Sequence, residues 1–378
     1  MTQSSPYPFV ARVRLNGQLV ATSRSTLRLD EAGAAPVLCF PVDDVSTELD
    51  DAVLTPMAPP GYIAFDQDHP AVSIELVDAV AGDDERDVTI KQFPTWGDAA
   101  DLIDVMDVRP DGDATFVTTV RADHRRSVVE GSQMLGQAIV AAGRHAPDRR
   151  VVSASMVFMR VADAAVPLGV ELDELSSGRT FTTLAAHVRQ GDRLCASGTL
   201  LLDVSAPDVI SHAAPPPDTP GPYESEPVDM SVTGRDIRVV DGAYTGDPDA
   251  PVGPPVLDAW VRFRSVPDDP PLHAGLLAQF TGHLSIAAAM RPHDGIGQDQ
   301  AHRTLSTAIN GINIAFHRGV RADQWMLYRH ESTYAGDGMT HSECRVYDEG
   351  GALVASFTVD AMVRAFSTDR PRDERSAL

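Results

Sequence analysis

Two polar side chains lie in helix-like stretches where they could take part in acid–base chemistry. His283 belongs to a run of small and apolar residues, 272–290, that predicts one long helix. A histidine on such a helix can act as a general base near neutral pH, although the pattern also fits a partly buried histidine that hydrogen-bonds the backbone. Thr281 and Ser285 flank it and add hydroxyl groups to the same segment.

Glu130 begins a second predicted helix, 130–145, whose apolar residues are spaced for one face. Its carboxylate could serve a reaction, or it could be the acidic group that a helix dipole favours at an N-terminus. Gln137 follows Gly136 in this helix as His283 follows Gly282 in the other. Gln137 is therefore either a polar partner at a site or an ordinary solvated side chain.

The other groups of polar residues give weaker evidence for a catalytic or metal site. His341, Ser342 and Glu343 are consecutive, and on a strand the serine would face away from the other two, so they do not form a catalytic triad. The 12 histidines include no HxH or HxxxH pair with a nearby carboxylate, and the 3 cysteines form no CxxC pair. The sequence predicts no metal and no cofactor.

The composition limits the partners and the compartment. The 378 residues carry a net charge of −23, which argues against nucleic acid, and any anionic ligand must meet a local group of arginines. Arg318 is a candidate phosphate contact, or only a surface charge. Sparse cysteines, a start without a signal peptide and no apolar run of membrane-spanning length predict a cytoplasmic protein without a membrane span.

One turn-and-strand pattern occurs twice. Residues 191–200 and 350–359 share glycine, leucine, alanine, serine and threonine in register. Around each copy the order is strand, helix and then several antiparallel strands. We therefore predict an α+β chain with a small, mostly β domain at 1–105, a first repeat at 106–207, a proline-rich linker at 208–235, a second repeat at 236–369 and a charged tail at 370–378.

A long helix wrapped by an antiparallel sheet, present twice, resembles the double (tandem) hot-dog acyl-CoA thioesterases of the type II, TesB-like group. The resemblance is densest in the second repeat, at residues 272–297, 316–318, 325–332 and 350–364, and it includes 136–142 and 178–183 in the first. The segments 12–21, 36–45 and 61–66 resemble the DUF427 β-domains, although the cysteine usual in that family is missing from 54–65.

The resemblance implies hydrolysis of an acyl-CoA thioester by a water that an Asp, a Ser or Thr and a Gln orient. Carried over by position, these residues fall at Gly282, near Ile309 and near Val359, so the usual set is not preserved. Thr307 lies one strand period from Ile309. The function is therefore either hydrolysis at an altered site or binding of acyl-CoA or lipid without turnover.

These considerations give two groups of candidate residues. The candidate catalytic residues are His283, Thr281, Thr307 and Glu130. The candidate substrate-binding residues are Gly282, Gln137, Gly136 and Arg318. Because hot-dog units need a neighbour to cover the sheet, the resemblance also implies that the chain could form homo-oligomers through these sheets.

Overall fold

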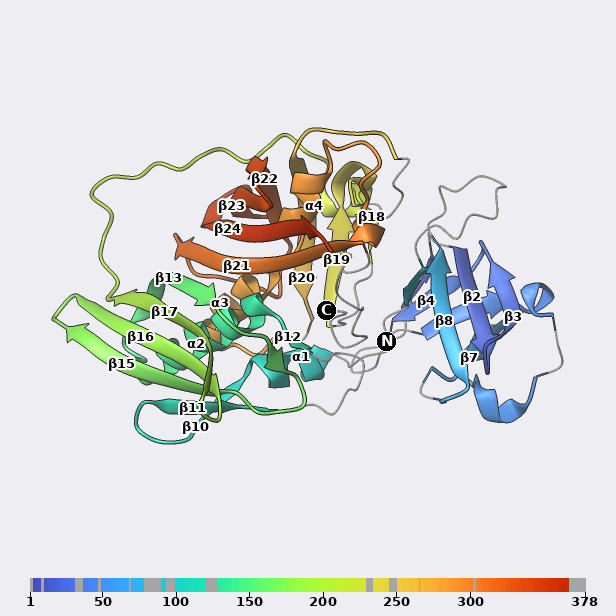
Figure 1. Cartoon of the computed structure of the whole chain (residues 1–378), viewed down its shortest axis with the longest axis horizontal. Coiled ribbons are helices and arrows are strands. Elements are labelled where there is room, and N and C mark those ends of the chain that lie inside the picture. The colour runs from blue at the N-terminus through green and yellow to red at the C-terminus, as the bar shows by residue number, and fades with distance from the viewer. Residues whose placement is uncertain are drawn as a thin grey trace.

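The computed structural model describes residues 3–7, 10–30, 37–46, 49–67, 69–77, 90–92, 99–119, 128–228, 234–244, 250–264, 266–301 and 304–366. The predicted charged tail, 370–378, lies outside these ranges. Figure 1 shows a smaller unit of strands from the first part of the chain and a larger sheet that curves around helices.

The described residues of the N-terminal part form nine strands in two sheets, ordered β1-β4-β5-β7-β6 and β3-β2-β8-β9. A turn at Asn16 and Gly17 joins β2 to β3, and both residues have positive φ values, 49° and 82°. This confirms the hairpin that the Asn-Gly pair favours. The elements are β1 (Gln3–Pro6), β2 (Val10–Leu15), β3 (Gln18–Ser23), β4 (Leu27–Asp30), β5 (Val37–Pro41), η1 (Val42–Asp44), η2 (Asp51–Val53), β6 (Leu54–Thr55), β7 (Tyr62–Phe65), β8 (Val72–Val77) and β9 (Ile90–Gln92).

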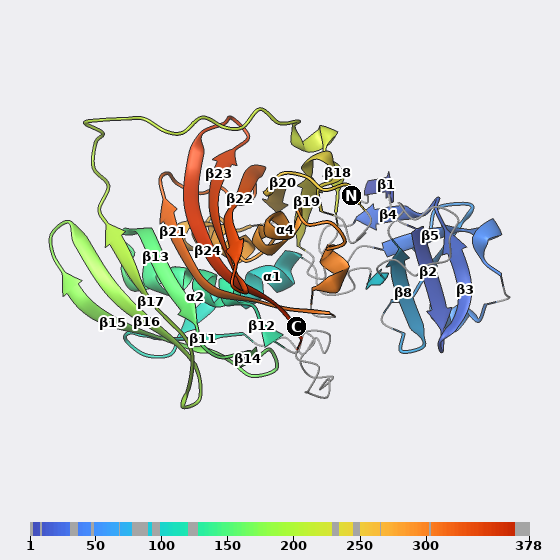
Figure 2. The ribbon, with the colours of Figure 1, turned by 45° about the horizontal axis from the view of Figure 1, so that its top comes forward.

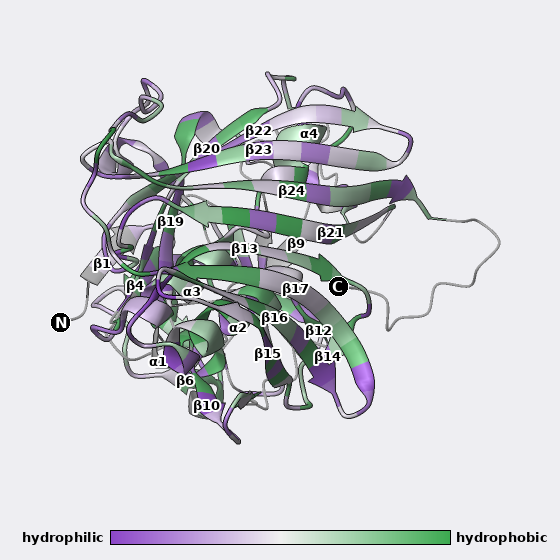
Figure 3. Cartoon of the chain, turned by 90° about the vertical axis from the view of Figure 1, so that its left-hand side faces the viewer, coloured by the Kyte–Doolittle hydropathy of each residue, from purple (hydrophilic) through white to green (hydrophobic). Residues whose placement is uncertain are grey.

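The rest of the chain forms a 13-stranded antiparallel sheet, ordered β10-β11-β15-β16-β17-β13-β21-β24-β23-β22-β20-β19-β18. Figure 3 shows these strands side by side, with β13 and β21 at the centre. The strands are β10 (Val108–Pro110), β11 (Thr115–Thr118), β13 (Arg150–Phe158), β15 (Gly169–Ser177), β16 (Phe181–Gln190), β17 (Arg193–Asp203), β18 (Glu226–Pro227), β19 (Arg235–Val239), β20 (Val256–Phe263), β21 (Leu305–Phe316), β22 (Met326–Gly336), β23 (Met339–Asp348) and β24 (Leu353–Ala365). A separate pair, β12 (Val128–Val129) and β14 (Ala162–Asp163), completes the strands of this part.

The repeated sequence pattern occupies equivalent places in the sheet. The first copy lies on β17, which pairs with β13 and β16, and the second lies on β24, which pairs with β21 and β23. The two halves meet where β13 pairs with β21, with Ser155 opposite Asn313. Two copies of one strand arrangement therefore share a continuous sheet.

Two helices, α2 (Gly131–His145) and α3 (Pro270–Phe280), pack against each other on the inner face of this sheet. Figure 2 shows α2 behind the strands of the first half and α4 (Ser285–Met290) behind those of the second. Helix α1 (Ala99–Met106) touches both α2 and α3. No helix in the described part of the chain is long and apolar enough to cross a membrane.

Glycines set the distance between α2 and α3. A Cβ atom added to Gly136 would lie 2.5 Å from the carbonyl oxygen of Gly275, and one added to Gly143 would lie 2.8 Å from the ring of Pro271. Because residue numbers rise along α2 as they fall along α3, the helices are antiparallel. The start of α2 therefore lies beside the end of α3.

The single helix predicted over 272–290 is wrong, because the structure breaks it between α3 and α4. The hydroxyl of Thr281 donates to the carbonyl of Ala278 and helps to end α3, and Leu284 takes a left-handed conformation with φ of 69°. A left-handed leucine costs about 1–2 kcal/mol, so packing must hold it. His283 consequently lies on a turn, and its direction does not follow helical geometry.

The proline-rich segment predicted as a linker is held against the second half of the sheet. Tyr347 donates a hydrogen bond to the carbonyl of Pro215, and the indole of Trp260 donates to that of Pro220. The segment also contains η3 (Pro222–Glu224) and the two-residue strand β18, although its many prolines disfavour both helix and sheet. Proline at an edge strand needs no ladder partner, which allows β18 to form. Two more short helices are η4 (Val240–Gly242) and η5 (Gln298–Gln300).

A polar cluster lies inside the core of the second half. His330 is 0% exposed, and its Nδ1 lies 3.0 Å from the hydroxyl of Ser285 and 3.4 Å from the thiol of Cys344. Burial lowers the pKa of His330 to about 3, and the nearby His283 adds to the effect. Burial likewise raises the pKa of Cys344 to about 12, so this thiol is inert at neutral pH.

We predict that His330 makes the protein sensitive to acid. An unfolded histidine binds a proton near pH 6.5 and the folded one only near pH 3, so between these values the unfolded state carries more protons. The free energy of unfolding should therefore fall as pH falls below 6.5, by at most about 1.4 kcal/mol per pH unit. Urea unfolding at pH 7 and pH 5 should show a smaller loss for His330→Gln than for the wild type. Replacing the exposed His212 by Gln should leave the loss unchanged, and equal slopes for all three proteins would contradict the prediction.

Gly136→Ala should destabilise the protein although alanine is the better helix former. The new methyl group would meet the backbone of Gly275, and such overpacking costs about 1–3 kcal/mol. Urea unfolding measures the effect, with Gly319→Ala as the control because a Cβ there meets nothing within 4 Å. A Gly136→Ala protein as stable as the control would show that the helix contact adjusts freely.

Candidate functional site

The start of α2 and the end of α3 bring together an acid, an amide and an imidazole. Glu130 is the residue before the first turn of α2, and one of its oxygens lies 3.6 Å from Nε2 of His283. The side-chain amide of Gln279 donates to the other oxygen at 3.3 Å. The structure thus joins two of the predicted catalytic residues, Glu130 and His283, across the two halves of the chain.

Arg235, at the start of β19, is the buried cation of this cluster. It is 4% exposed, donates to Oε1 of Gln279 at 2.7 Å and lies 3.1 Å from Nε2 of His283. An arginine only donates, so the ring nitrogen accepts this hydrogen bond and is unprotonated when the bond forms. In that state the 3.6 Å approach of His283 to Glu130 is a contact without a hydrogen bond.

The ring of Phe280 packs against the side chains of both His283 and Arg235. The imidazole of His283 stacks on it with centroids 4.8 Å apart and an interplanar angle of 3°. The guanidinium of Arg235 lies 5.1 Å from the centre of the same ring. Such a cation–π contact stabilises a desolvated arginine by roughly 2 kcal/mol. Stacking on Phe280 therefore fixes the imidazole of His283, which the helix break places beside Glu130.

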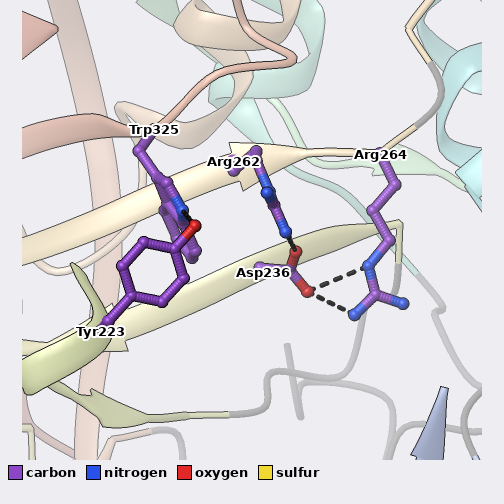
Figure 4. Close-up of polar contacts among 5 residues, drawn as sticks. All are labelled: Tyr223, Asp236, Arg262, Arg264 and Trp325. Carbon is purple, nitrogen blue, oxygen red and sulfur yellow. Dashed lines mark hydrogen bonds and ion pairs between the residues drawn. The ribbon is translucent and has the colours of Figure 1, made fainter. Parts of the chain in front are cut away.

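Ion pairs on the opposite face of β19 fix the strand that carries Arg235 (Figure 4). Asp236 accepts hydrogen bonds from Arg262, at 2.7 Å, and from Arg264. Burial alone would raise the pKa of Asp236, but the hydrogen bonds and charges of the two arginines lower it below its usual value. Arg262 also lies 4.8 Å from the ring of Trp325, whose indole N–H points to the hydroxyl of Tyr223 at 3.4 Å.

Close packing surrounds the first turn of α2. A Cβ on Gly131 would lie 2.7 Å from the ring of Phe158, so only glycine fits there. A Cβ on Gly282 would overlap the hydroxyl of Ser132 and lie 3.3 Å from Cδ1 of Ile309. Gly282, where the family resemblance places the Asp, and Ile309, near which it places the Ser or Thr, therefore lie beside each other and beside Ser132.

The remaining predicted residues are placed differently. Thr281 is fully buried and its hydroxyl binds the helix backbone, while Thr307 is buried on β21.

The predicted substrate-binding residues are also scattered. Gln137 is 0% exposed and donates to the carbonyl of Val105, and Gly136 lies in the α2–α3 contact. Arg318 lies on the exposed loop after β21. Of this group, the structure brings only Gly282 to the cluster.

The opposite ends of the same helices are closed by ion pairs. Arg144, in the last turn of α2, donates to Asp269 at the start of α3 at 2.7 Å, contacts Asp107, and donates to the carbonyl of Val108. A cation at a helix C-terminus and an anion at a helix N-terminus also suit both dipoles. The α2–α3 pair thus presents its reactive side chains at one end.

The other polar motifs considered in the sequence lie apart from the Glu130 cluster. His341 binds Asp360 at 2.7 Å on the outer face of the sheet, while Ser342 is buried on the inner face, which confirms that these neighbours form no triad. Among the described residues no group of three or more His, Cys, Asp or Glu could hold a metal ion.

Sequence reasoning missed Arg235, Gln279 and Ser132. Arg235 fell at the last residue of the predicted linker, and no periodicity of that segment indicates that it points inward. Gln279 lies four residues before His283, a helical spacing that could have suggested a shared face. Ser132 carries no signal beyond its place two residues after Glu130.

The amino-acid sequence of this chain is similar to those of known acyl-CoA thioesterases. The family models of the acyl-CoA thioesterase N-terminal and C-terminal domains match residues 119–202 and 207–363. Human acyl-coenzyme A thioesterase 8 is 24% identical over 270 residues, which are 62% of this chain and 80% of that protein. Acyl-CoA thioesterase 2 of Haemophilus influenzae is 22% identical over 254 residues, with 62% and 87% covered.

Several solved structures are similar to the structure of this chain. Acyl-CoA thioesterase II TesB2 from Mycobacterium marinum is 26% identical, covers 72% of this chain and 100% of its own, and has a TM-score of 0.57. The tesB protein of Mycobacterium avium subs paratuberculosis is 21% identical, covers 70% and 99%, and has a TM-score of 0.60. A hot dog fold protein from Alicyclobacillus acidocaldarius, 16% identical with 71% and 99% covered and a TM-score of 0.57, shares the fold. The sheet wrapped around α2 and α3 is thus a hot-dog architecture, and the chain belongs to the acyl-CoA thioesterase family.

Proposed function

We propose that this chain hydrolyses an acyl-CoA thioester at the junction of α2 and α3, with Glu130 as the general base. The observation that carries the proposal is the contact of Glu130 with Gln279 and His283, which come from the other half of the chain. A site assembled from two tandem hot-dog units is consistent with the single reactive end of the α2–α3 pair.

The hydrogen bonds around Glu130 favour it over His283 as the proton acceptor. Arg235 binds the oxygen of the Gln279 side chain, which turns the amide N–H group toward the carboxylate. The same arginine donates a hydrogen bond to the unprotonated Nε2 of His283. The carboxylate of Glu130 is 29% exposed and can therefore reach water. In this proposal His283 shapes the site and Glu130 takes the proton.

Atoms and charges balance in the proposed reaction. The carboxylate of Glu130 removes a proton from water as the water oxygen bonds to the thioester carbonyl carbon, and the carbonyl electron pair moves onto its oxygen. When the carbonyl re-forms, the carbon–sulfur bond breaks and the proton passes from Glu130 to the departing thiolate. The products are a carboxylic acid and free CoA, and the carboxylate is regenerated.

A second candidate function is binding of acyl-CoA without hydrolysis. The family resemblance assigns polar residues to Gly282 and to positions near Ile309 and near Val359, and Val359 is 1% exposed in the apolar core. These substitutions favour a pocket that has lost its water-orienting groups. Saturable binding of acyl-CoA without release of CoA would support this function over the first.

Further parts of the proposal rest on the sequence. Acyl-CoA as the ligand, homo-oligomers through the outer sheet faces, a cytoplasmic location and a DUF427-like N-terminal unit remain predictions. So do the roles of Thr281, Thr307, Gly136, Gln137 and Arg318. Titration of the purified full-length chain with acyl-CoA, and its mass in solution, would test the ligand and the oligomeric state.

We expect the full-length protein to release CoA from acyl-CoA substrates with an optimum in acyl chain length. The measurement is a panel of short, medium and long acyl-CoAs, with free CoA separated by chromatography so that the three cysteines do not interfere. Absence of release from every substrate would contradict hydrolysis.

Glu130→Gln should lower kcat/KM by about 10²–10⁴-fold, because the amide cannot accept the proton from water. The matched control is Glu171→Gln, which removes a carboxylate that pairs with Arg189 on the sheet surface. Steady-state release of CoA by the two variants and the wild type checks this. Equal activity of Glu130→Gln and the control would remove Glu130 as the base.

A further inference from the structure

The hydroxyl of Ser132 is buried and lacks a hydrogen-bond partner among the described residues. Ser132 is 1% exposed, and its Oγ atom meets no donor or acceptor within bonding geometry. By contrast, the buried Ser285 binds His330. A buried hydroxyl without a partner costs about 1–3 kcal/mol, so a structural role alone gives no reason for a serine at position 132.

The side chain of Ser132 occupies the space that a side chain at position 282 would need. A Cβ atom on Gly282 would overlap Oγ of Ser132, so a side chain at one position excludes a side chain at the other unless the backbone shifts. Gly282 lies on the turn that carries His283, one residue along the chain. The hydroxyl therefore faces the same junction as Glu130 and its partners.

The start of α2 adds a favourable electrostatic environment. Ser132 belongs to the first turn of this 15-residue helix, and no side chain caps the helix start. The first N–H groups of a helix have no intrahelical acceptor, and the dipole gives this end a partial positive charge. An oxygen that gains negative charge would be stabilised beside the hydroxyl and the helix end.

We propose that Ser132 is a catalytic residue that donates a hydrogen bond to the thioester carbonyl oxygen as that oxygen becomes negatively charged. This inference rests on the proposed hydrolysis and adds to it the group opposite Glu130. The hydroxyl keeps its proton throughout: it donates to the oxyanion of the tetrahedral intermediate and is released when the carbonyl re-forms. The substrate carbonyl thereby supplies the partner that Oγ otherwise lacks.

Ser132→Ala tests this assignment in the full-length protein. Loss of one oxyanion donor should lower kcat by about 10²–10³-fold with KM nearly unchanged. The thermal midpoint should stay the same or rise, because the variant removes an unsatisfied buried hydroxyl. Ser342→Ala is the matched control: it removes another buried hydroxyl without a described partner, on β23, and should leave turnover unchanged.

Two further variants separate chemistry from packing. Gly282→Ala should lower both the thermal midpoint and turnover, because its methyl group overlaps Oγ of Ser132. Adding Ser132→Gly to it should restore the midpoint and leave turnover low. Recovery of turnover in this double variant would overturn the proposal, because no hydroxyl would remain at position 132.

Three further outcomes would overturn the proposed role of Ser132, and the last of them would also overturn the proposed hydrolysis. If Ser132→Ala releases CoA at the wild-type rate, the role of Ser132 is overturned but the proposed hydrolysis is not. An acyl-enzyme that accumulates on Ser132, seen by mass spectrometry of the quenched reaction, would make the serine a nucleophile and also overturn the donor role. No CoA release by the wild type from any acyl-CoA would overturn both this inference and the proposed hydrolysis.

Discussion

The antiparallel contact of α2 with α3 is the constraint on which the rest of this molecule depends. Gly136 and Gly275 let the two backbones approach so closely that no other residue fits at either position. At that distance the first turn of one helix lies directly beside the last turn of the other. The contact joins the two halves of the chain inside the sheet, as the pairing of β13 with β21 joins them within it.

The site proposed at this junction takes its side chains from both halves. Glu130 and Ser132 come from the first, and Arg235, Gln279 and His283 from the second. Burying Arg235 is costly, but the amide of Gln279, the imidazole of His283 and the face of Phe280 surround its guanidinium. In a chain of net charge −23, this single cation lies inside and orders an acid, an amide and an imidazole.

Much of the fold can be predicted from the sequence because its elements have strong local patterns. The strands β13, β15 to β17 and β21 to β24 and the helix α2 follow from alternating and helical spacing, and the turn at Asn16 follows from its residue types. The end of α3 does not, because 272–290 reads as one helix on local propensity. Tertiary packing overrides that propensity and stabilises a left-handed Leu284.

The sequence by itself determined the repeated strand order and the resemblance to the family, and it predicted Glu130 and His283 as candidate site residues. These depend on spacing along the chain, which a sequence carries directly. Only the tertiary structure decided that Glu130 meets His283, that Arg235 points inward and that Ser132 occupies the space left open by Gly282. Those relations join residues up to 153 positions apart, as Glu130 and His283 are, and their physical cause is close packing between two helices, which no local pattern encodes.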